Sequence, residues 1–209
     1  MAGDTKQRIL ETALELLAQN GYLGTSMQDI AVRIGIPKAA LYKHYAGKQE
    51  ILDRIVARMH EMDAARAKAY EMPEAEQDSF AEAYLRVPAE KIRAYSKAQF
   101  DHWTKDAFAA NFRKMLTLEQ YRTPELAGLY QQCLAGGPIA YMAAIFRELT
   151  DSDASAMQLA LEFYAPMFLL YSLYDGAADK TSIEPLLDAH IDRFICKLEA
   201  EYRRPETGL

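Results

Sequence analysis

Residues 26–45 constrain the fold of this chain more than any other stretch. They read SMQDIAVRIGIPKAALYKHY, in which one glycine separates two short runs with the apolar spacing of helices. Thr25 and Ser26 are candidate N-caps, and Gln28 follows Thr25 at the spacing of a capping box. We therefore expect a short helix from about Met27, followed by a tight turn at Gly35.

A second short helix is expected to follow this turn and to run to about His44. Pro37 suits its first turn, and Leu41 is its main inward residue. Its outer side offers Lys38, Ala39, Tyr42, Lys43 and His44. Two short helices joined in this way are typical of a helix-turn-helix, which lays one helix into the major groove of DNA. The alternative is an ordinary helical hairpin with a basic edge.

The flanking segments continue the helical pattern on both sides. Upstream, apolar residues recur through 6–20, and Asn20 with Gly21 ends the periodicity. Downstream, an amphipathic helix begins near Lys48 and runs to about Tyr70. The whole run, RILETALELLAQNGYLGTSMQDIAVRIGIPKAALYKHYAGKQEIL, resembles the DNA-binding domain of the tetracycline-repressor (TetR) family of one-component regulators.

This resemblance implies roles for individual residues. The expected phosphate contacts are Thr25, Ser26, Tyr42 and Lys48. The residues expected to face base edges are Gln28, Lys38, Ala39 and Lys43, with His44 on the same surface. Many members of the family carry hydroxyl residues where Pro37, Ala40 and Gly47 stand here. We therefore expect base readout to depend on the two lysines, because lysine can pair with guanine O6 or N7.

The charge distribution agrees with a DNA-binding N-terminal region. The chain carries a net charge of -6, but residues 1–60 hold eight Lys or Arg against six Asp or Glu, an excess of two positive charges. Residues 61–209 hold sixteen against twenty-four, an excess of eight negative charges. The basic excess is small, which indicates that a second copy of the domain is needed for tight binding.

The remainder of the chain shows helical patterns with short breaks and no alternating strand pattern. We expect an all-α fold in which a three-helix helix-turn-helix domain, residues 1–47, is joined by a long fourth helix to a helical effector-binding and dimerisation domain, residues 48–209. The polar interval 72–79, which contains a proline, is the best candidate for a linker. Residues 156–174 are apolar enough to imitate a membrane span, but Glu162 and Pro166 near the middle favour a buried helix, so we expect no membrane association.

The resemblance also implies a homodimer in which the last two long helices pair with those of a second copy. The apolar residues expected at this interface are Phe163, Met167, Leu170, Leu187, Ile191, Phe194 and Leu198. Pairing would place two reading helices about 34 to 36 Å apart, the spacing of successive major grooves on one side of DNA.

The middle helices are rich in aromatic and sulfur-containing side chains. In the family that the chain resembles, such residues surround lipophilic effectors. The expected pocket residues are Phe100, Trp103, Phe112, Met115, Glu119, Tyr141 and Phe146. The alternative is that these residues are plain core, as aromatic residues at helical spacing commonly are.

No motif indicates catalysis or a cofactor. The four histidines lie in four different helical patterns, and neither a phosphate-binding glycine loop nor a nucleophile elbow is present. The pairs His102 with Asp106 and Asp188 with Asp192 have metal-capable spacing but suit a solvated helix face, so we expect no metal. Cys133 and Cys196 match no metal or redox spacing. No secretory signal pattern opens the sequence, and we expect a cytoplasmic protein.

The predicted function is a ligand-responsive, DNA-binding transcriptional regulator and not an enzyme. We expect a repressor that binds a near-palindromic double-stranded operator. A small lipophilic effector of unknown identity is expected to bind the C-terminal domain. Its binding would change the distance between the two helix-turn-helix domains of the dimer and so release the operator. The alternative is a helical DNA-binding or interaction protein with no small-molecule effector.

Overall fold

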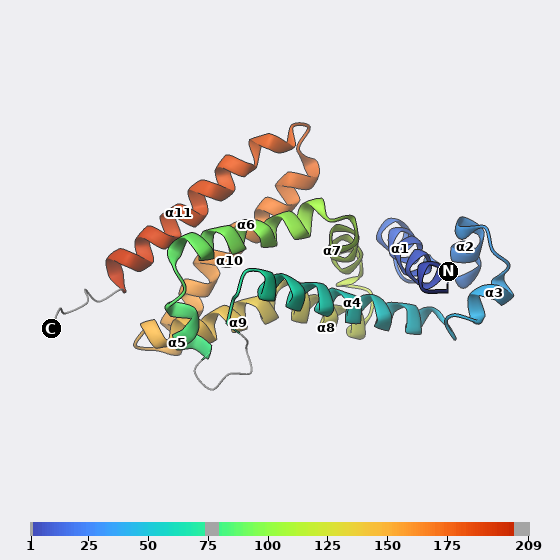
Figure 1. The fold of residues 1–209 in the computed structure, drawn as a ribbon, viewed down its shortest axis with the longest axis horizontal. Coiled ribbons are helices and arrows are strands. Elements are labelled where there is room, and N and C mark those ends of the chain that lie inside the picture. Colours follow the sequence, from blue (N-terminus) through green and yellow to red (C-terminus); the bar gives the residue numbers. More distant parts are fainter. Residues whose placement is uncertain (1, 74–79, 203–209) are drawn as a thin grey trace. The chain divides into compact units, whose positions relative to one another are not determined.

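The computed structural model describes residues 2–73 and 80–202, and this part of the chain consists of helices joined by turns, with no strand (Figure 1). The expected all-α fold is therefore confirmed. The α-helices are α1 (Ala2–Asn20), α2 (Met27–Ile34), α3 (Lys38–Tyr42), α4 (Lys48–Ala69), α5 (Phe80–Leu85), α6 (Ala89–Lys105), α7 (Ala107–Glu119), α8 (Pro124–Leu134), α9 (Gly136–Phe146), α10 (Asp153–Gly176) and α11 (Glu184–Glu201). Short 3-10 turns occupy Arg147–Leu149 and Lys180–Ser182. Of the predicted linker at 72–79, residues 74–79 lie outside the described part.

The chain forms two compact units. The first consists of Met1–Arg66 together with Lys105–Gln132, and the second of Ala67–Thr104 together with Cys133–Leu209. Within the first unit, α7 packs against α1. The division into domains at residues 47 and 48 stays a prediction.

The core of the first unit lies between α1, α2, α4 and α7. Ile9, Leu14 and Leu17 of α1 are fully buried, as are Phe112 and Met115 of α7. Burying one such side chain contributes roughly 1.5–3 kcal/mol relative to leaving it exposed. The α1 and α7 helices thus form a scaffold that carries the shorter helices α2 and α3.

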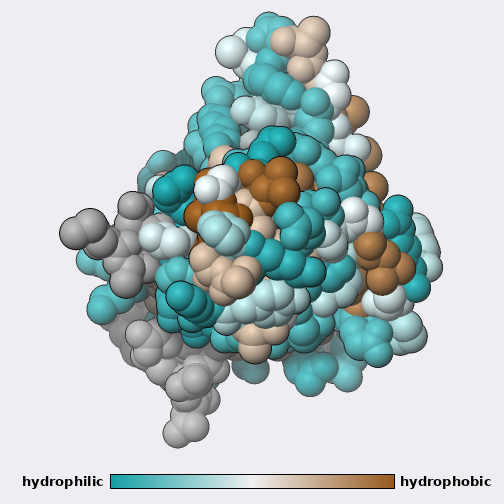
Figure 2. Space-filling model, turned by 90° about the vertical axis from the view of Figure 1, so that its right-hand side faces the viewer, coloured by the Kyte–Doolittle hydropathy of each residue, from teal (hydrophilic) through white to brown (hydrophobic). Residues whose placement is uncertain are grey.

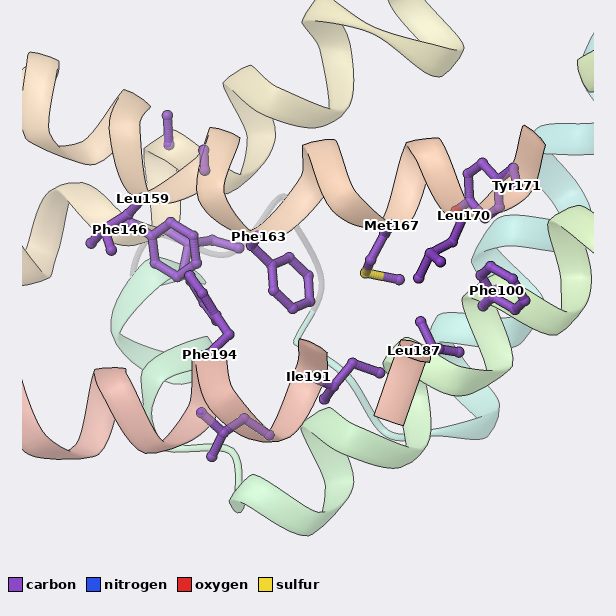
Figure 3. Packing of buried hydrophobic residues seen from close by; sticks show 14 of the residues in the cluster. Phe100, Phe146, Leu159, Phe163, Met167, Leu170, Tyr171, Leu187, Ile191 and Phe194 are labelled. Atoms are coloured by element: carbon purple, nitrogen blue, oxygen red, sulfur yellow. The ribbon is translucent and has the colours of Figure 1, made fainter. Parts of the chain in front are cut away.

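The core of the second unit centres on α10, which packs against α9 and α11. Figure 3 shows Phe163 and Met167 of α10 pointing toward Ile191 and Phe194 of α11. The rings of Phe163 and Phe194 lie 4.8 Å apart between centroids. Helix α10 is long and apolar enough to cross a membrane by length and composition, but the buried part of its surface faces this core.

The residues predicted for the dimer interface contribute to that same core within one chain, and their part in a contact between two chains stays a prediction. Six of them are buried within one chain: Phe163, Met167, Leu170, Leu187, Ile191 and Phe194. Leu198 is partly buried against the same cluster. Helices α10 and α11 of one chain face each other, and the apolar side of each helix is covered by the other.

Candidate nucleic-acid interface

Helix α2 begins with a reciprocal cap. The Ser26 Oγ accepts a hydrogen bond from the Asp29 backbone N–H at 3.2 Å, and Asp29 Oδ2 accepts one from the Ser26 backbone N–H at 2.8 Å. The Ser26 hydroxyl also donates to Asp29 Oδ2 at 2.7 Å, and this hydrogen bond, together with that from the Ser26 backbone N–H, holds the pKa of the Asp29 carboxyl below its usual value. The predicted capping box of Thr25 with Gln28 is wrong, because the Thr25 hydroxyl donates instead to the carbonyls of Leu16 and Gly21.

The turn between α2 and α3 depends on Gly35. This residue has φ 80° and ψ 32°, in the left-handed region that side chains other than glycine rarely adopt. Its N–H donates to the carbonyls of Ala31 and Val32, and the Ile36 N–H donates to Ala31 as well. The expected tight turn is confirmed.

Helix α3 is shorter than expected. Pro37 stands just before its first residue, and the helix ends at Tyr42, two residues before His44. The His44 N–H donates to the Leu41 carbonyl, so the chain continues as a turn. Leu41 is fully buried and fixes the inner side of α3 against the first unit's core.

The outer side of α3 carries the residues expected to read bases. Lys38, Ala39 and Lys43 are exposed, His44 is half-buried, and Gln28 of α2 is exposed as well. Figure 2 views the molecule from the side of α2 and α3, where the surface is largely hydrophilic with hydrophobic patches between. The Lys38 Nζ lies 6.0 Å from the centre of the exposed Tyr42 ring, within reach of a cation–π contact.

Two of the residues expected to contact phosphates are engaged inside the domain instead of being free at its surface. Thr25 is only 2% exposed. The half-buried Lys48 donates through Nζ to the carbonyls of Tyr22 and Thr25, and its ammonium lies 4.2 Å from the centre of the Tyr22 ring. Burial lowers the pKa of Lys48, while Glu119 and Asp29 oppose this shift.

Sequence reasoning missed the part that Tyr22 and Glu119 play beside this surface. The Glu119 side chain is fully buried at the end of α7, and its Oε1 accepts from the Tyr22 N–H at 2.8 Å. The two residues lie 97 positions apart in the chain, and no local pattern links them. Glu119 had been expected in an effector pocket.

The predicted pocket residues are divided between the two units. Those on α7, in the first unit, are Phe112, Met115 and Glu119. Those in the second unit are Phe100, Trp103, Tyr141 and Phe146. Among the latter, Phe100 stacks on Tyr171 in the core, and Tyr141 contacts Phe80.

A cavity of about 660 Å³ lies in the second unit. Of the predicted pocket residues only Phe146 lines it. Its apolar lining includes Leu85, Ile92, Met142, Ile145, Phe163 and Phe194. The carboxylates that line it are Glu148, Asp151 and Glu199, and no lysine or arginine is among its described lining residues.

Across residues 2–73 and 80–202 no three metal-binding side chains gather into a group that could hold an ion. Cys133 is half-buried and Cys196 is exposed, and neither forms a disulfide bond within the described residues.

The comparison with known sequences concerns the N-terminal part of the chain. Residues 9–55 match the sequence model described as "Bacterial regulatory proteins, tetR family". The biofilm operon icaADBC HTH-type negative transcriptional regulator IcaR of Staphylococcus epidermidis is 41% identical over 51 residues, which is 24% of this chain and 28% of that protein. The HTH-type transcriptional regulator SrpR of Pseudomonas putida is 35% identical over 63 residues, 30% of either chain. The chain thus spans less than a third of the length of these two relatives.

Solved structures resemble the chain over nearly its whole length. A TetR-like transcriptional regulator from Rhodococcus sp. RHA1 has a TM-score of 0.63 at 16% identity, over 91% of this chain and 94% of that one. At such low identity the likeness concerns the fold, including the helical second unit that the sequence matches do not reach.

Proposed function

We propose that the chain is a TetR-family regulator, on the match of residues 9–55, and that it is a DNA-binding transcriptional regulator that acts as a repressor. The observation that carries this proposal is the exposed outer side of α3, held by the capped α2 and the left-handed turn at Gly35. Under this proposal the protein works in the cytoplasm, where its double-stranded operator lies.

Base readout is assigned to Lys38, Lys43 and Ala39, with Gln28 beside them. The lysines would donate to guanine O6 or N7, and the methyl group of Ala39 suits contact with a thymine methyl. Tyr42 and Ser26 would contact phosphates. The Lys48 ammonium and the Thr25 hydroxyl are already hydrogen-bonded within the domain. We therefore assign these side chains to stabilising the α1–α2 connection, and any phosphate contact of the two residues to their backbone groups.

The regulator would act as a homodimer, through a different face of α10 from the one that its sequence pattern indicated. Four apolar side chains on this helix are exposed at multiples of four residues: Met157, Leu161, Leu169 and Leu173. Positions four residues apart form a ridge inclined to the helix axis, so these side chains make a stripe that runs obliquely around α10. A second copy of the chain would cover this stripe and bring two α3 helices to one operator.

The cavity of the second unit would be the effector site. Its volume of about 660 Å³ falls in the range of roughly 300–1,000 Å³ typical of small-molecule pockets. Its apolar lining suits a lipophilic molecule. Ligand binding there would favour a conformation in which the spacing of the two DNA-binding heads no longer fits the operator.

The decisive experiment is selection of genomic fragments with the purified chain, followed by a salt titration of the best fragment. Enrichment of a near-palindrome whose half-sites lie about one helical turn apart supports the proposal. A Lys38→Ala/Lys43→Ala double variant serves as control and should enrich no such sequence. Recovery of nothing beyond salt-sensitive background by the wild type would contradict it.

The second candidate is a helical DNA-binding or interaction protein without an effector. Thermal unfolding against a library of lipophilic compounds separates the two candidates. An effector site gives shifts of the melting temperature that grow with ligand concentration, whereas a protein without one gives a flat response.

A further inference from the structure

The connection between α1 and α2 decides where the first helix of the helix-turn-helix begins. It comprises residues 21–26, and its last residue, Ser26, is the N-cap of α2. The Thr25 hydroxyl donates to the Gly21 carbonyl at 3.0 Å and to the Leu16 carbonyl at 3.2 Å. The connection is therefore hydrogen-bonded both within itself and to the last turns of α1.

Helix α7 holds this connection from one side. The Glu119 Oε1 accepts from the Tyr22 N–H at 2.8 Å and from Arg122 Nη1 at 3.0 Å. The approach is so close that a Cβ on Gly21 would lie 2.4 Å from Glu119 Oε1 and 2.3 Å from Arg122 Nη1. Gly21 also has φ +78°, a backbone conformation that favours glycine, and a Cβ there would displace the ends of the Glu119 and Arg122 side chains.

Helix α4 holds the same connection from the other side. The Lys48 Nζ donates to the Tyr22 carbonyl and, at 2.7 Å, to the Thr25 carbonyl. The Tyr22 hydroxyl donates to Gln49 Oε1 at 2.8 Å. Both backbone polar groups of Tyr22 are thus bonded by charged side chains from two helices that are distant from it in sequence.

The opposite charges of Glu119 and Lys48 further stabilise the α1–α2 connection. Glu119 is 0% exposed, and its carboxylate favours the charged form of the half-buried Lys48. Hydrogen bonds to charged groups are stronger than those between neutral groups. A neutral side chain at position 119 would weaken the contact with Tyr22, the pairing with Arg122 and the attraction to Lys48 at once.

We propose that Glu119 is a positioning residue for DNA recognition, which fixes the α1–α2 connection through Tyr22 and thereby sets the placement of α2 and α3. This inference rests on the proposed DNA-binding function. Glu119 itself touches no base or phosphate under this proposal; it acts through Tyr22 and, together with Lys48, holds the reading helices in the arrangement that fits the major groove.

The test compares Glu119→Gln with Glu125→Gln. Glutamine keeps the size of the buried side chain but removes its charge and one acceptor atom. Glu125 is an exposed carboxylate at the start of α8 in the same unit, so its substitution removes the same charge without touching the connection. Two quantities are measured below the melting temperature of each variant: backbone amide exchange of residues 21–29 and the operator dissociation constant as a function of salt.

For Glu119→Gln we expect faster exchange at Tyr22 and at the start of α2, and an operator dissociation constant raised about tenfold, because the amide oxygen of glutamine can still accept from the Tyr22 N–H but the hydrogen bond loses its charge and becomes weaker. The slope against salt should stay as in the wild type, because no phosphate contact is removed. Glu125→Gln should match the wild type in both measurements.

A purely structural role predicts another result, which would overturn the proposal. In that case folded Glu119→Gln binds operator with wild-type affinity, and its amide exchange rises evenly over α1, α2 and α7. If the wild type selects no operator at all, the proposed function fails, and amide exchange alone then decides whether Glu119 positions the connection.

Discussion

Ser26 and Asp29 cap helix α2 reciprocally, each accepting a hydrogen bond from the backbone N–H of the other. Removing the serine hydroxyl leaves a helix N-terminal N–H without this partner. We expect Ser26→Ala to lower the free energy of unfolding by about 1 kcal/mol. Denaturant unfolding measures the loss, with Gln28→Ala as the control, since Gln28 is exposed on the same helix and takes no part in the cap.

The same cap predicts a pH dependence. Hydrogen bonds from Ser26 lower the pKa of Asp29 in the folded chain, so its carboxylate stabilises the fold above its unfolded pKa, and this contribution is lost as the pH falls through the folded pKa. The difference in unfolding free energy between the wild type and Asp29→Asn should therefore be constant near neutral pH and shrink toward acid. A difference that grew on acidification would contradict the assigned hydrogen bonds.

Lys43 and Tyr42 should affect DNA binding in different ways. Lys43→Ala should relax base preference at one position in each half-site, at a cost of about 1–3 kcal/mol for the preferred base. Tyr42→Phe should weaken binding to all sequences alike, because a phosphate contact carries no sequence information. Binding to a library of operator variants separates the two effects.

The matched control is Lys68→Ala, which removes a positive charge from an exposed position of α4 far along the chain from α3. An unchanged preference profile for Lys43→Ala would mean that another side of α3 faces the bases.

The exposed stripe on α10 predicts the oligomeric state. Leu169 is 60% exposed at its centre, and Leu169→Glu should place a charge in the contact between two copies. Light scattering should give twice the chain mass of 23.6 kDa for the wild type and a single chain mass for the variant. Leu23→Glu alters a similarly exposed leucine in the first unit and should leave the dimer intact. A wild-type mass of one chain would refute the dimer.

The lining of the second unit's cavity predicts the charge of its ligands. Because it combines aromatic and aliphatic side chains with the carboxylates of Glu148, Asp151 and Glu199, lipophilic cations should raise the melting temperature more than anions of similar size. Replacing Met142 by Trp should narrow the cavity and reduce these shifts. Val32→Trp adds the same side chain at an exposed site and should leave the shifts unchanged. Equal shifts for cations and anions would contradict the assignment.

The parts of the fold that depend on neighbouring residues could be predicted from the sequence. The turn at Gly35 and the start of α2 near Met27 follow from local backbone and capping preferences. The partner in the cap was assigned wrongly, because Thr25 and Ser26 are both good caps and only the burial of Thr25 decides between them.

Contacts between distant segments could not be predicted in this way. The apolar stripe of α11 correctly indicated that Phe194 and Ile191 are buried, but a periodic pattern does not tell which chain covers them. Likewise the buried contact of Glu119 with Tyr22 joins residues 97 positions apart, and an acidic residue at the end of an apolar helix is usually at the surface.

Because α7 packs on α1, the helix-turn-helix domain of residues 1–47 cannot be exchanged between regulators as an independent unit. A chimaera made by grafting residues 1–47 onto the body of another regulator would carry Ile9, Leu14 and Leu17 without the helix that covers them here, and Tyr22 without its buried acceptor. Transfer of this DNA-binding domain to another regulator therefore requires that α7 be transferred with residues 1–47. Alternatively, the operator specificity can be changed by exchanging only the residues on the outer side of α3.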